Sequence, residues 1–187
     1  MTKKRTTQTK ENLVQAFLKV AENKRIDKIT IKEVTDTAGY YRSTFYEYFL
    51  DLQDLIDQIE DSLIKKAEKQ ALDSVSDITP EAFTYKCVSF YESNANLLLI
   101  LLGDKGDPTF EVKLKKALRP LFNQQLGISD DNLHTKYLVE FFISGILATL
   151  THWFRHKKDL PLEELVELIS PIVRSEIVPT MKKVNHK

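Results

Sequence analysis

Two histidines and one cysteine are the first candidates for catalysis or metal binding. His152 and His156 are spaced i, i+4, so a helix would place both imidazoles on one face, and Cys87 is the only cysteine. The residues between the histidines are Trp-Phe-Arg and lack the glutamate of a zinc-protease helix, and no cysteine cluster suggests structural zinc. Cys87 lies beside Val88 within an expected helix, which favours an inert thiol over a nucleophile. We therefore expect no enzymatic activity, no metal site and no cofactor.

A second group of side chains is suited to nucleic acid. Arg42 could donate two hydrogen bonds to guanine, while Thr44 and Tyr46 could bond phosphates and fix register without reading sequence. The candidate outward groups of this segment are Tyr41, Arg42, Ser43, Thr44, Tyr46 and Tyr48. Residues 1–50 hold 10 Lys/Arg and 6 Asp/Glu, a net charge of +4, whereas the remainder holds 17 and 21, a net charge of −4. A basic N-terminal segment on an acidic body agrees with binding to double-stranded DNA.

Two short helices are expected to position these groups. Thr30 and Glu33 form a capping box, which favours a helix over 31–37 rather than the strand that the alternation of 29–34 could also indicate. This helix ends at Gly39, which can adopt the left-handed conformation, and a further helix follows over about 41–48. Residues 30–49 thus predict a helix-turn-helix whose second helix enters a major groove, although a plain helical hairpin has the same pattern. Its expected core is Val34, Ala38, Phe45 and Phe49.

The rest of the chain is also expected to be helical, which gives an all-α fold. The predicted helices cover about 7–23, 52–72, 80–102, 108–126, 130–157 and 161–182. A kink or break is expected at Pro120, a cap at Ser129 or Asp130, and an internal proline at Pro171. We expect a DNA-binding domain over 1–50 and a helical domain for effector binding and dimerisation over 51–187, connected by the helix over 52–72.

The stretch ITIKEVTDTAGYYRSTFYEYFLDLQDLI resembles the DNA-binding domain of the TetR family of bacterial transcriptional regulators. The resemblance covers about residues 8–65. It is carried by Ala16-Phe17, Ala38-Gly39, Thr44-Phe45-Tyr46, Phe49 and Asp51. Farther along, the run from Asn94 to Phe110 is similar to a TetR subgroup of low-GC bacteria. The resemblance implies a homodimeric regulator of this type, usually a repressor, that binds a near-palindromic operator.

The resemblance also implies which residues touch DNA. Arg42, Ser43, Thr44, Tyr46 and Tyr48 fall on recognition-helix positions, and Lys3-Lys4-Arg5 would lie near the backbone or minor groove. With Thr30 and Tyr41 these residues make up the expected DNA-binding set. Tyr40 and Tyr41 stand where the family commonly has a small apolar residue and a serine, and Leu52 replaces a phosphate-binding lysine. Losing one phosphate contact would flatten the salt dependence by about one unit of log–log slope.

The apolar residues of the predicted helix over 130–157 exceed what one face can hold. They are Tyr137, Leu138, Phe141, Phe142, Ile143, Ile146, Leu147, Leu150, Trp153 and Phe154. Either this helix is buried all round or one face serves a partner. With the last helix it would suit a four-helix interface between two subunits, which sets two recognition helices on half-sites about 34–36 Å apart or a multiple of that.

A pocket for a small-molecule effector is expected in the C-terminal domain, although the same side chains could be core. They are Phe83, Tyr85, Cys87, Phe90, Tyr91, Phe110, Phe141, His152 and Trp153. A protein partner could act there instead. The longest apolar run spans Leu97–Leu102, where about 20 residues are needed to cross a bilayer, and no apolar segment of a secretory signal follows the basic start.

We therefore interpret the chain as a cytoplasmic regulator without membrane association. Two alternatives remain open from the sequence. One is a partner-binding adaptor with weakened DNA binding. The other is an all-helical enzyme or metalloprotein that uses a C-terminal cavity.

Overall fold

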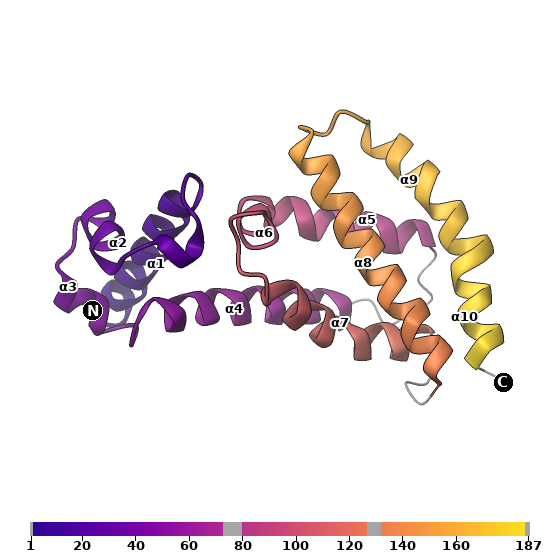
Figure 1. The fold of residues 1–187 in the computed structure, drawn as a ribbon, viewed down its shortest axis with the longest axis horizontal. Helices are drawn as coiled ribbons and strands as arrows, with labels where there is room; N and C mark the ends of the chain where they lie inside the picture. The colour runs from indigo at the N-terminus through magenta and orange to yellow at the C-terminus, as the bar shows by residue number, and fades with distance from the viewer. Residues whose placement is uncertain (1, 73–79, 127–131, 186–187) are drawn as a thin grey trace. The chain divides into compact units, whose positions relative to one another are not determined.

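The structure is a computed structural model that describes residues 2–72, 80–126 and 132–185, and within these ranges all regular secondary structure is helical (Figure 1). The expected all-α fold is thereby confirmed. The elements are α1 (Thr2–Ala21), the 3-10 turn η1 (Ile26–Lys28), α2 (Ile31–Ala38), α3 (Arg42–Tyr46), α4 (Leu52–Leu72), α5 (Pro80–Ser93), α6 (Ala95–Leu101), α7 (Phe110–Leu126), α8 (Leu133–Arg155), α9 (Leu162–Ile172), the π-helical turn η2 (Val173–Ile177) and α10 (Val178–Asn185).

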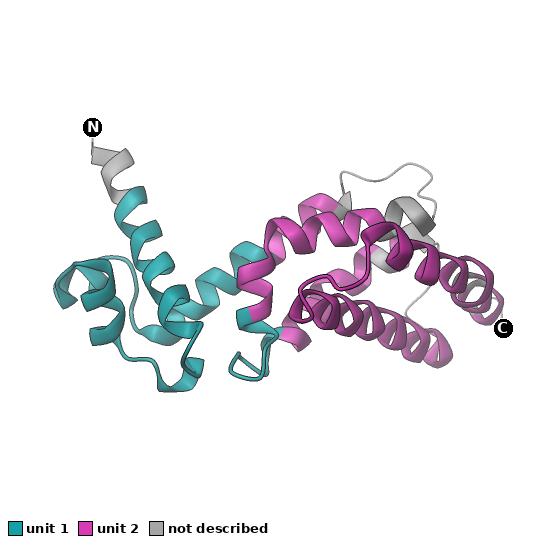
Figure 2. Ribbon diagram, turned by 90° about the horizontal axis from the view of Figure 1, so that it is seen from above, with its two compact units in different colours: residues 1–63, 100–110 teal, residues 64–99, 111–187 magenta. Residues whose placement is uncertain are grey.

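The chain forms two compact units (Figure 2). Unit 1 comprises residues 1–63 and 100–110, and unit 2 comprises residues 64–99 and 111–187. Unit 1 therefore holds the whole 1–50 segment expected to bind DNA, the first part of α4, and a short segment from much later in the sequence. The functional boundary expected at residue 50 stays a prediction.

The core of unit 1 is formed by apolar side chains spaced for helical faces. Leu13 and Phe17 of α1, Val34 of α2, and Phe45 of α3 are each 0% exposed. Full burial of one such side chain contributes about 1.5–3 kcal/mol before the entropy of ordering is counted. This core fixes the orientation of α3, because Phe45 leaves only the other faces of that short helix exposed.

The segment 100–110 is tied to the link that follows α1. The Ile26 amide donates to the Lys105 carbonyl (2.9 Å), and the Lys105 ammonium donates to the Asn23 carbonyl (3.3 Å). Gly106 lies so close to the end of α6 that a Cβ there would be 2.2 Å from the carbonyl oxygen of Leu101. The turn after α6 consequently requires glycine.

In unit 2, α8 packs against α10 and α5 packs against α9 (Figure 1). One cluster of the core contains Val139, Phe142, Ile143, Val173 and Met181. Ion pairs join α7 to α8, because Lys115 and Arg119 contact the two carboxylate oxygens of Glu140 at 2.7 and 2.8 Å. The hydrogen bond between Lys115 and Glu140 raises the pKa of the lysine and lowers the pKa of the glutamate.

Several of the predicted helices have different ends or interruptions in the structure. The helix predicted over 80–102 is broken at Asn94, whose side-chain amide donates to the Phe90 carbonyl (2.9 Å) and so competes with the helical ladder. The cap of α8 is Asn132, whose side-chain oxygen accepts from the amides of His134 and Thr135. Ser129 and Asp130, the caps that were expected, lie outside the described residues.

The prolines act differently from one another. Pro120 lies inside α7, which is assigned as one helix from Phe110 to Leu126. The final predicted helix is instead divided by η2, which lies between Pro171 and Pro179. Each of these prolines lacks the N–H that a regular α-helical ladder uses, and a π-helical turn shifts the ladder by one residue.

Candidate nucleic-acid interface

The start of α2 is fixed by a capping box. The Thr30 hydroxyl accepts from the Glu33 amide (3.3 Å), and the Glu33 carboxylate accepts from the Thr30 amide (2.9 Å) and hydroxyl (2.8 Å). Lys24 adds an ion pair to the same carboxylate at 2.7 Å. The hydrogen bonds from Lys24 and Thr30 lower the pKa of Glu33 to about 2. The predicted cap is confirmed. Within it, the Thr30 hydroxyl acts both as a donor and as an acceptor.

The turn between α2 and α3 combines a glycine with a tyrosine anchor. Gly39 has φ +73°, in the left-handed region, as the sequence predicted. Tyr40 is half-buried, and its hydroxyl accepts from the Asn12 side-chain amide of α1 (2.9 Å). Asn12 in turn accepts from Gln8 (3.0 Å). The bulky residue at position 40 therefore anchors the turn to α1.

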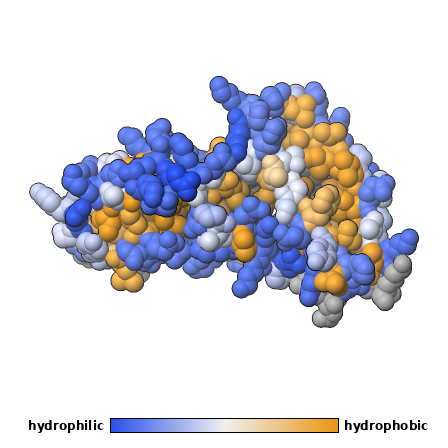
Figure 3. Space-filling view, in the orientation of Figure 1, coloured by the Kyte–Doolittle hydropathy of each residue, from blue (hydrophilic) through white to orange (hydrophobic). Residues whose placement is uncertain are grey.

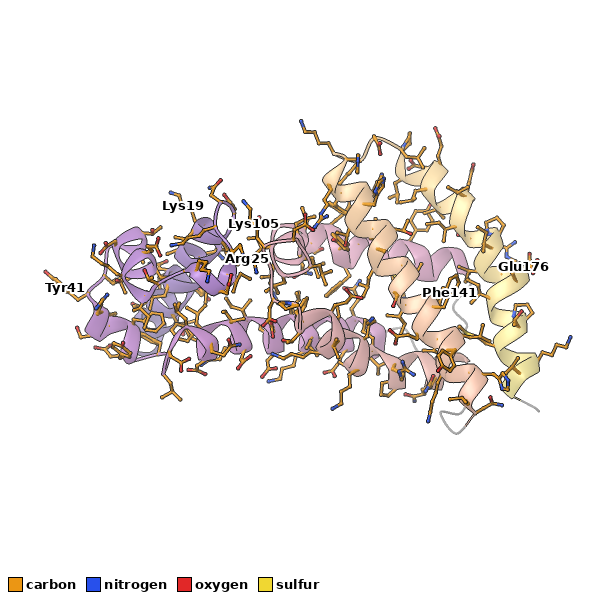
Figure 4. All side chains as sticks on the ribbon, in the orientation of Figure 1. Lys19, Arg25, Tyr41, Lys105, Phe141 and Glu176 are labelled. Atoms are coloured by element: carbon orange, nitrogen blue, oxygen red, sulfur yellow. The ribbon has the colours of Figure 1, made fainter. Side chains whose placement is uncertain are left out.

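The outward surface of α3 and its flanks is aromatic and polar. Tyr41 is 84% exposed and Tyr46 is 57% exposed, and Arg42 and Ser43 are also exposed. Thr44 and Tyr48 are half-buried. Figure 4 shows the Tyr41 side chain extending away from the ribbon at the start of α3. Six of the predicted contact residues thus lie on or beside one short helix.

Aromatic packing holds this helix against the core of unit 1. The rings of Phe45 and Phe49 are 5.3 Å apart, and the ring of Tyr46 meets Phe45 edge to face at 5.8 Å. The Lys10 ammonium lies 5.5 Å from the centroid of Phe49 and also donates to Gln58 of α4. Sequence reasoning missed the role of Lys10, because its partners are 39 and 48 residues away and share no periodic pattern with it.

The remaining predicted contacts are Thr30, which is the N-cap of α2, and three residues of α1. Lys3, Lys4 and Arg5 belong to the first turns of α1, which starts earlier than the sequence indicated, and their side chains lie outside what the structure describes. A different group of cations lies in unit 1, where Lys19, Arg25 and Lys105 are all exposed and gather in Figure 4.

The predicted pocket residues are dispersed. Phe110 is fully buried in unit 1, whereas the other members belong to unit 2. Tyr91 is buried, its ring stacks on Phe154 at 4.6 Å, and its hydroxyl bonds to Thr151 (2.8 Å). Trp153 is buried and donates to the Leu160 carbonyl (2.7 Å).

Other members of that set are half-buried, exposed or undescribed. Phe90 and Cys87 are half-buried, and desolvation of the thiol raises the pKa of Cys87 to about 12. A thiol with that pKa is protonated at neutral pH and unreactive. Tyr85 is 45% exposed and Phe141 is 68% exposed, and His152 is also on the surface. The side chain of Phe83 lies outside what is described.

The two histidines form a stacked pair. The ring centroids of His152 and His156 are 4.0 Å apart, and the Nδ1 of His156 lies 2.8 Å from the His152 carbonyl oxygen. Among the described residues, no group of three or more His, Cys, Asp or Glu side chains is placed to hold a metal ion.

An exposed apolar surface runs along α8 and α9. Leu133, Tyr137 and Phe141 are 64%, 71% and 68% exposed and follow one another at i, i+4 along α8, and Leu168 and Ile172 of α9 are 62% and 51% exposed. We refer to these five residues as the α8–α9 face. Figure 3 shows apolar atoms gathered over these helices, and Figure 4 places Phe141 on α8. By length and composition alone, α8 is long and apolar enough to cross a bilayer. A helix with an apolar contact face meets the same two criteria, so the finding is weak evidence for a membrane span.

The chain matches one protein-family model and is similar to several solved structures. Residues 78–175, just over half of the chain, match the TetR-type family model described as "Transcriptional regulator C-terminal region". Among solved structures, a TetR transcriptional regulator from Streptococcus agalactiae 2603V is 24% identical, with 91% of this chain and 96% of that chain covered and a TM-score of 0.68.

Two further structures are similar in fold. The fatty acid degradation regulator FadR from Bacillus halodurans is 14% identical, with coverages of 90% and 96% and a TM-score of 0.66. FadR from Bacillus subtilis, solved in complex with stearoyl-CoA, is 17% identical, with coverages of 89% and 98% and a TM-score of 0.62. At these identities the structures establish the shared fold. No curated protein sequence matches the chain.

Proposed function

Because the chain belongs to the TetR family of transcriptional regulators, we propose that it is a cytoplasmic, homodimeric repressor that binds a near-palindromic operator through residues 30–49. A small molecule or a protein partner acting on unit 2 would release it from DNA. The family is one of transcription regulators rather than enzymes.

The observation that carries the DNA-binding proposal is the exposed surface of α3, a helix that is held in place by its neighbours. The Thr30–Glu33 cap, the Gly39 turn and the buried Phe45 fix the helix, and Tyr41 and Arg42 at its start project into solvent. The first turn of a recognition helix is the part that reaches base edges. Arg42 is the group we assign to guanine, because a guanidinium can donate two hydrogen bonds to its O6 and N7.

Selection of genomic fragments on the purified protein tests this assignment. We expect the wild type to enrich a near-palindromic sequence and Arg42→Ala to bind it roughly 5- to 150-fold more weakly per half-site, which is the range for one lost bidentate contact. The control is Lys116→Ala, which removes one exposed positive charge from α7 and should leave affinity nearly unchanged. If the wild type enriches no fragment over Arg42→Ala, the DNA-binding proposal fails and the adaptor alternative gains support.

The α8–α9 face supports the homodimer. Its large apolar side chains are exposed to solvent in the single chain, which is unfavourable in free energy. A second copy of the same face would bury them. Gly145 and Ala148 are exposed on α8 as well, and small residues allow two helices to approach closely. Two copies of this face would form a two-fold interface, which matches a near-palindromic operator.

Effector control is supported by polar atoms inside unit 2. Within the described residues, the side-chain oxygens of Asn123 and Thr135 are buried and have no hydrogen-bonding partner. Buried polar groups are ordinarily satisfied, so a bound molecule or water would gain by supplying the missing donor. FadR from Bacillus subtilis was solved with stearoyl-CoA, so this fold can hold a ligand. Cys87, Phe90 and Tyr91 remain our candidates for the pocket wall.

A further inference from the structure

The turn between α8 and α9 brings a cation onto aromatic rings. The Lys158 ammonium lies 4.9 Å from the ring centroid of Phe154 and 5.5 Å from that of Trp153. It also forms an ion pair with Glu92 of α5. Aromatic faces together with one carboxylate are the components that bind organic ammonium ions. We call Trp153, Phe154 and Glu92 the cation cage.

The walls of the cage are held by contacts that do not involve the lysine. The Trp153 indole N–H donates to the Leu160 carbonyl (2.7 Å), and its ring meets Phe154 at 80° with the centroids 5.2 Å apart. Tyr91 stacks on Phe154 at 4.6 Å and is itself bonded to Thr151. Removing the lysine side chain would therefore leave the rings in place, which is the preorganisation that a binding site needs.

The lysine occupies the cage through a costly backbone conformation. Lys157 and Lys158 have φ of 57° and 56°, which is the left-handed region that residues with a Cβ seldom adopt. The amide of Lys158 donates to the Trp153 carbonyl (2.9 Å), so the turn delivers the ammonium back over the end of α8. Strained positions persist where surrounding contacts impose them and are common at functional sites. The Lys158 side chain is nevertheless 43% exposed, so a solute can reach it.

We propose that the cation cage is a binding site for methylated ammonium ions and that Lys158 is its intramolecular competitor. A primary ammonium is strongly hydrated and loses water on reaching the rings. A quaternary ammonium has an apolar surface and needs no hydrogen-bond acceptor, so two ring faces and the Glu92 charge suit it better. This site requires neither DNA nor a second subunit, so it goes beyond the function proposed above and can be tested separately.

Trp153 provides the readout, because it is the only tryptophan in the chain. The full chain is titrated with tetramethylammonium chloride at constant ionic strength while tryptophan fluorescence is recorded, and 3,3-dimethylbutanol serves as a neutral probe of similar shape. We expect a saturable change with the cation only. Lys158→Gln should bind roughly tenfold more tightly than the wild type, because removing a competitor restores the binding-competent fraction.

Three variants make the result specific. Lys158→Arg keeps a competing cation and should remain as weak as the wild type, whereas Lys157→Gln removes the neighbouring charge and should also leave affinity unchanged. Adding Phe154→Leu to Lys158→Gln should abolish the gain. The proposal is overturned if Lys158→Gln binds no more tightly than Lys158→Arg, or if the neutral probe gives the same signal as the cation. Should Lys158→Gln lose its helical circular dichroism, the wild-type titration decides: no saturable signal with the cation overturns the proposal.

Discussion

Replacement of Gly106 by alanine tests the turn after α6 in the most direct way. The added Cβ would lie 2.2 Å from the Leu101 carbonyl oxygen and 2.5 Å from the Ile100 carbonyl oxygen. These are backbone atoms, so rotation of a side chain cannot relieve the contact. The chain would have to move by about 1 Å to restore an ordinary separation, and forcing extra volume into packed structure costs about 1–3 kcal/mol.

The matched control is Gly39→Ala in the same unit. A Cβ at Gly39 meets nothing within 4 Å, but the residue has φ +73°. We expect a loss of about 1 kcal/mol there, which is the cost of holding alanine in the left-handed region. For Gly106→Ala we expect about 3 kcal/mol, which corresponds to a fall in Tm of roughly 12–24 °C for a unit of this size.

Urea and thermal unfolding of both variants, followed by circular dichroism, measure the difference. The order of the two effects is what the geometry predicts, because one arises from atomic overlap and the other from backbone conformation. If Gly106→Ala unfolds at the same urea concentration as the wild type, or costs less than Gly39→Ala, then Gly106 does not lie against the carbonyls of Ile100 and Leu101 as described.

Two more measurements follow from the cap and from the α8–α9 face. The pKa of Glu33 is lowered to about 2 from 4.5, so its interactions with Lys24 and Thr30 stabilise the fold above pH 4.5 and are lost as the pH falls from 4.5 towards 2. Unfolding of Glu33→Gln should accordingly show lower stability than the wild type at pH 7 and a shrinking difference below pH 4.5; a difference independent of pH would contradict the ion pair. Phe141→Glu should shift the protein from dimer to monomer in sedimentation experiments, whereas Val112→Glu, on an exposed site of α7, should remain dimeric. A dimer that survives Phe141→Glu places the interface elsewhere.

The local features of the helix-turn-helix were predictable from the sequence. A capping box depends on Thr30 and Glu33, which are three residues apart, and the left-handed turn depends on Gly39 alone. The bounds of α4 were predicted correctly because its apolar residues follow the helical period without interruption. Such signals are contained in short windows of sequence.

Contacts between distant segments could not be predicted in this way. The bond from Asn12 to Tyr40 joins residues 28 apart, and Lys24 reaches Glu33 from outside its helix. The exposure of Phe141 was equally hidden, because α8 has apolar residues around its whole circumference and periodicity does not separate an inner face from an outer one. No glycine or proline adjoins Asn94, so the sequence carried no signal for the helix break there. The hydrogen bond from the Asn94 side chain to the Phe90 carbonyl is visible only in the structure.

The segment 100–110 has a consequence for the order in which the protein can fold. Lys105 contacts the Asn23 carbonyl across 82 positions of sequence, and Phe110 is fully buried in unit 1. The N-terminal unit therefore stays incomplete on the ribosome until residue 110 has emerged, although its helix-turn-helix has been available since residue 49. Closing so long a loop is entropically unfavourable and slows assembly relative to the local helices. All residues of the helix-turn-helix are thus synthesised well before the segment that completes its unit, and most of unit 2 is synthesised later still.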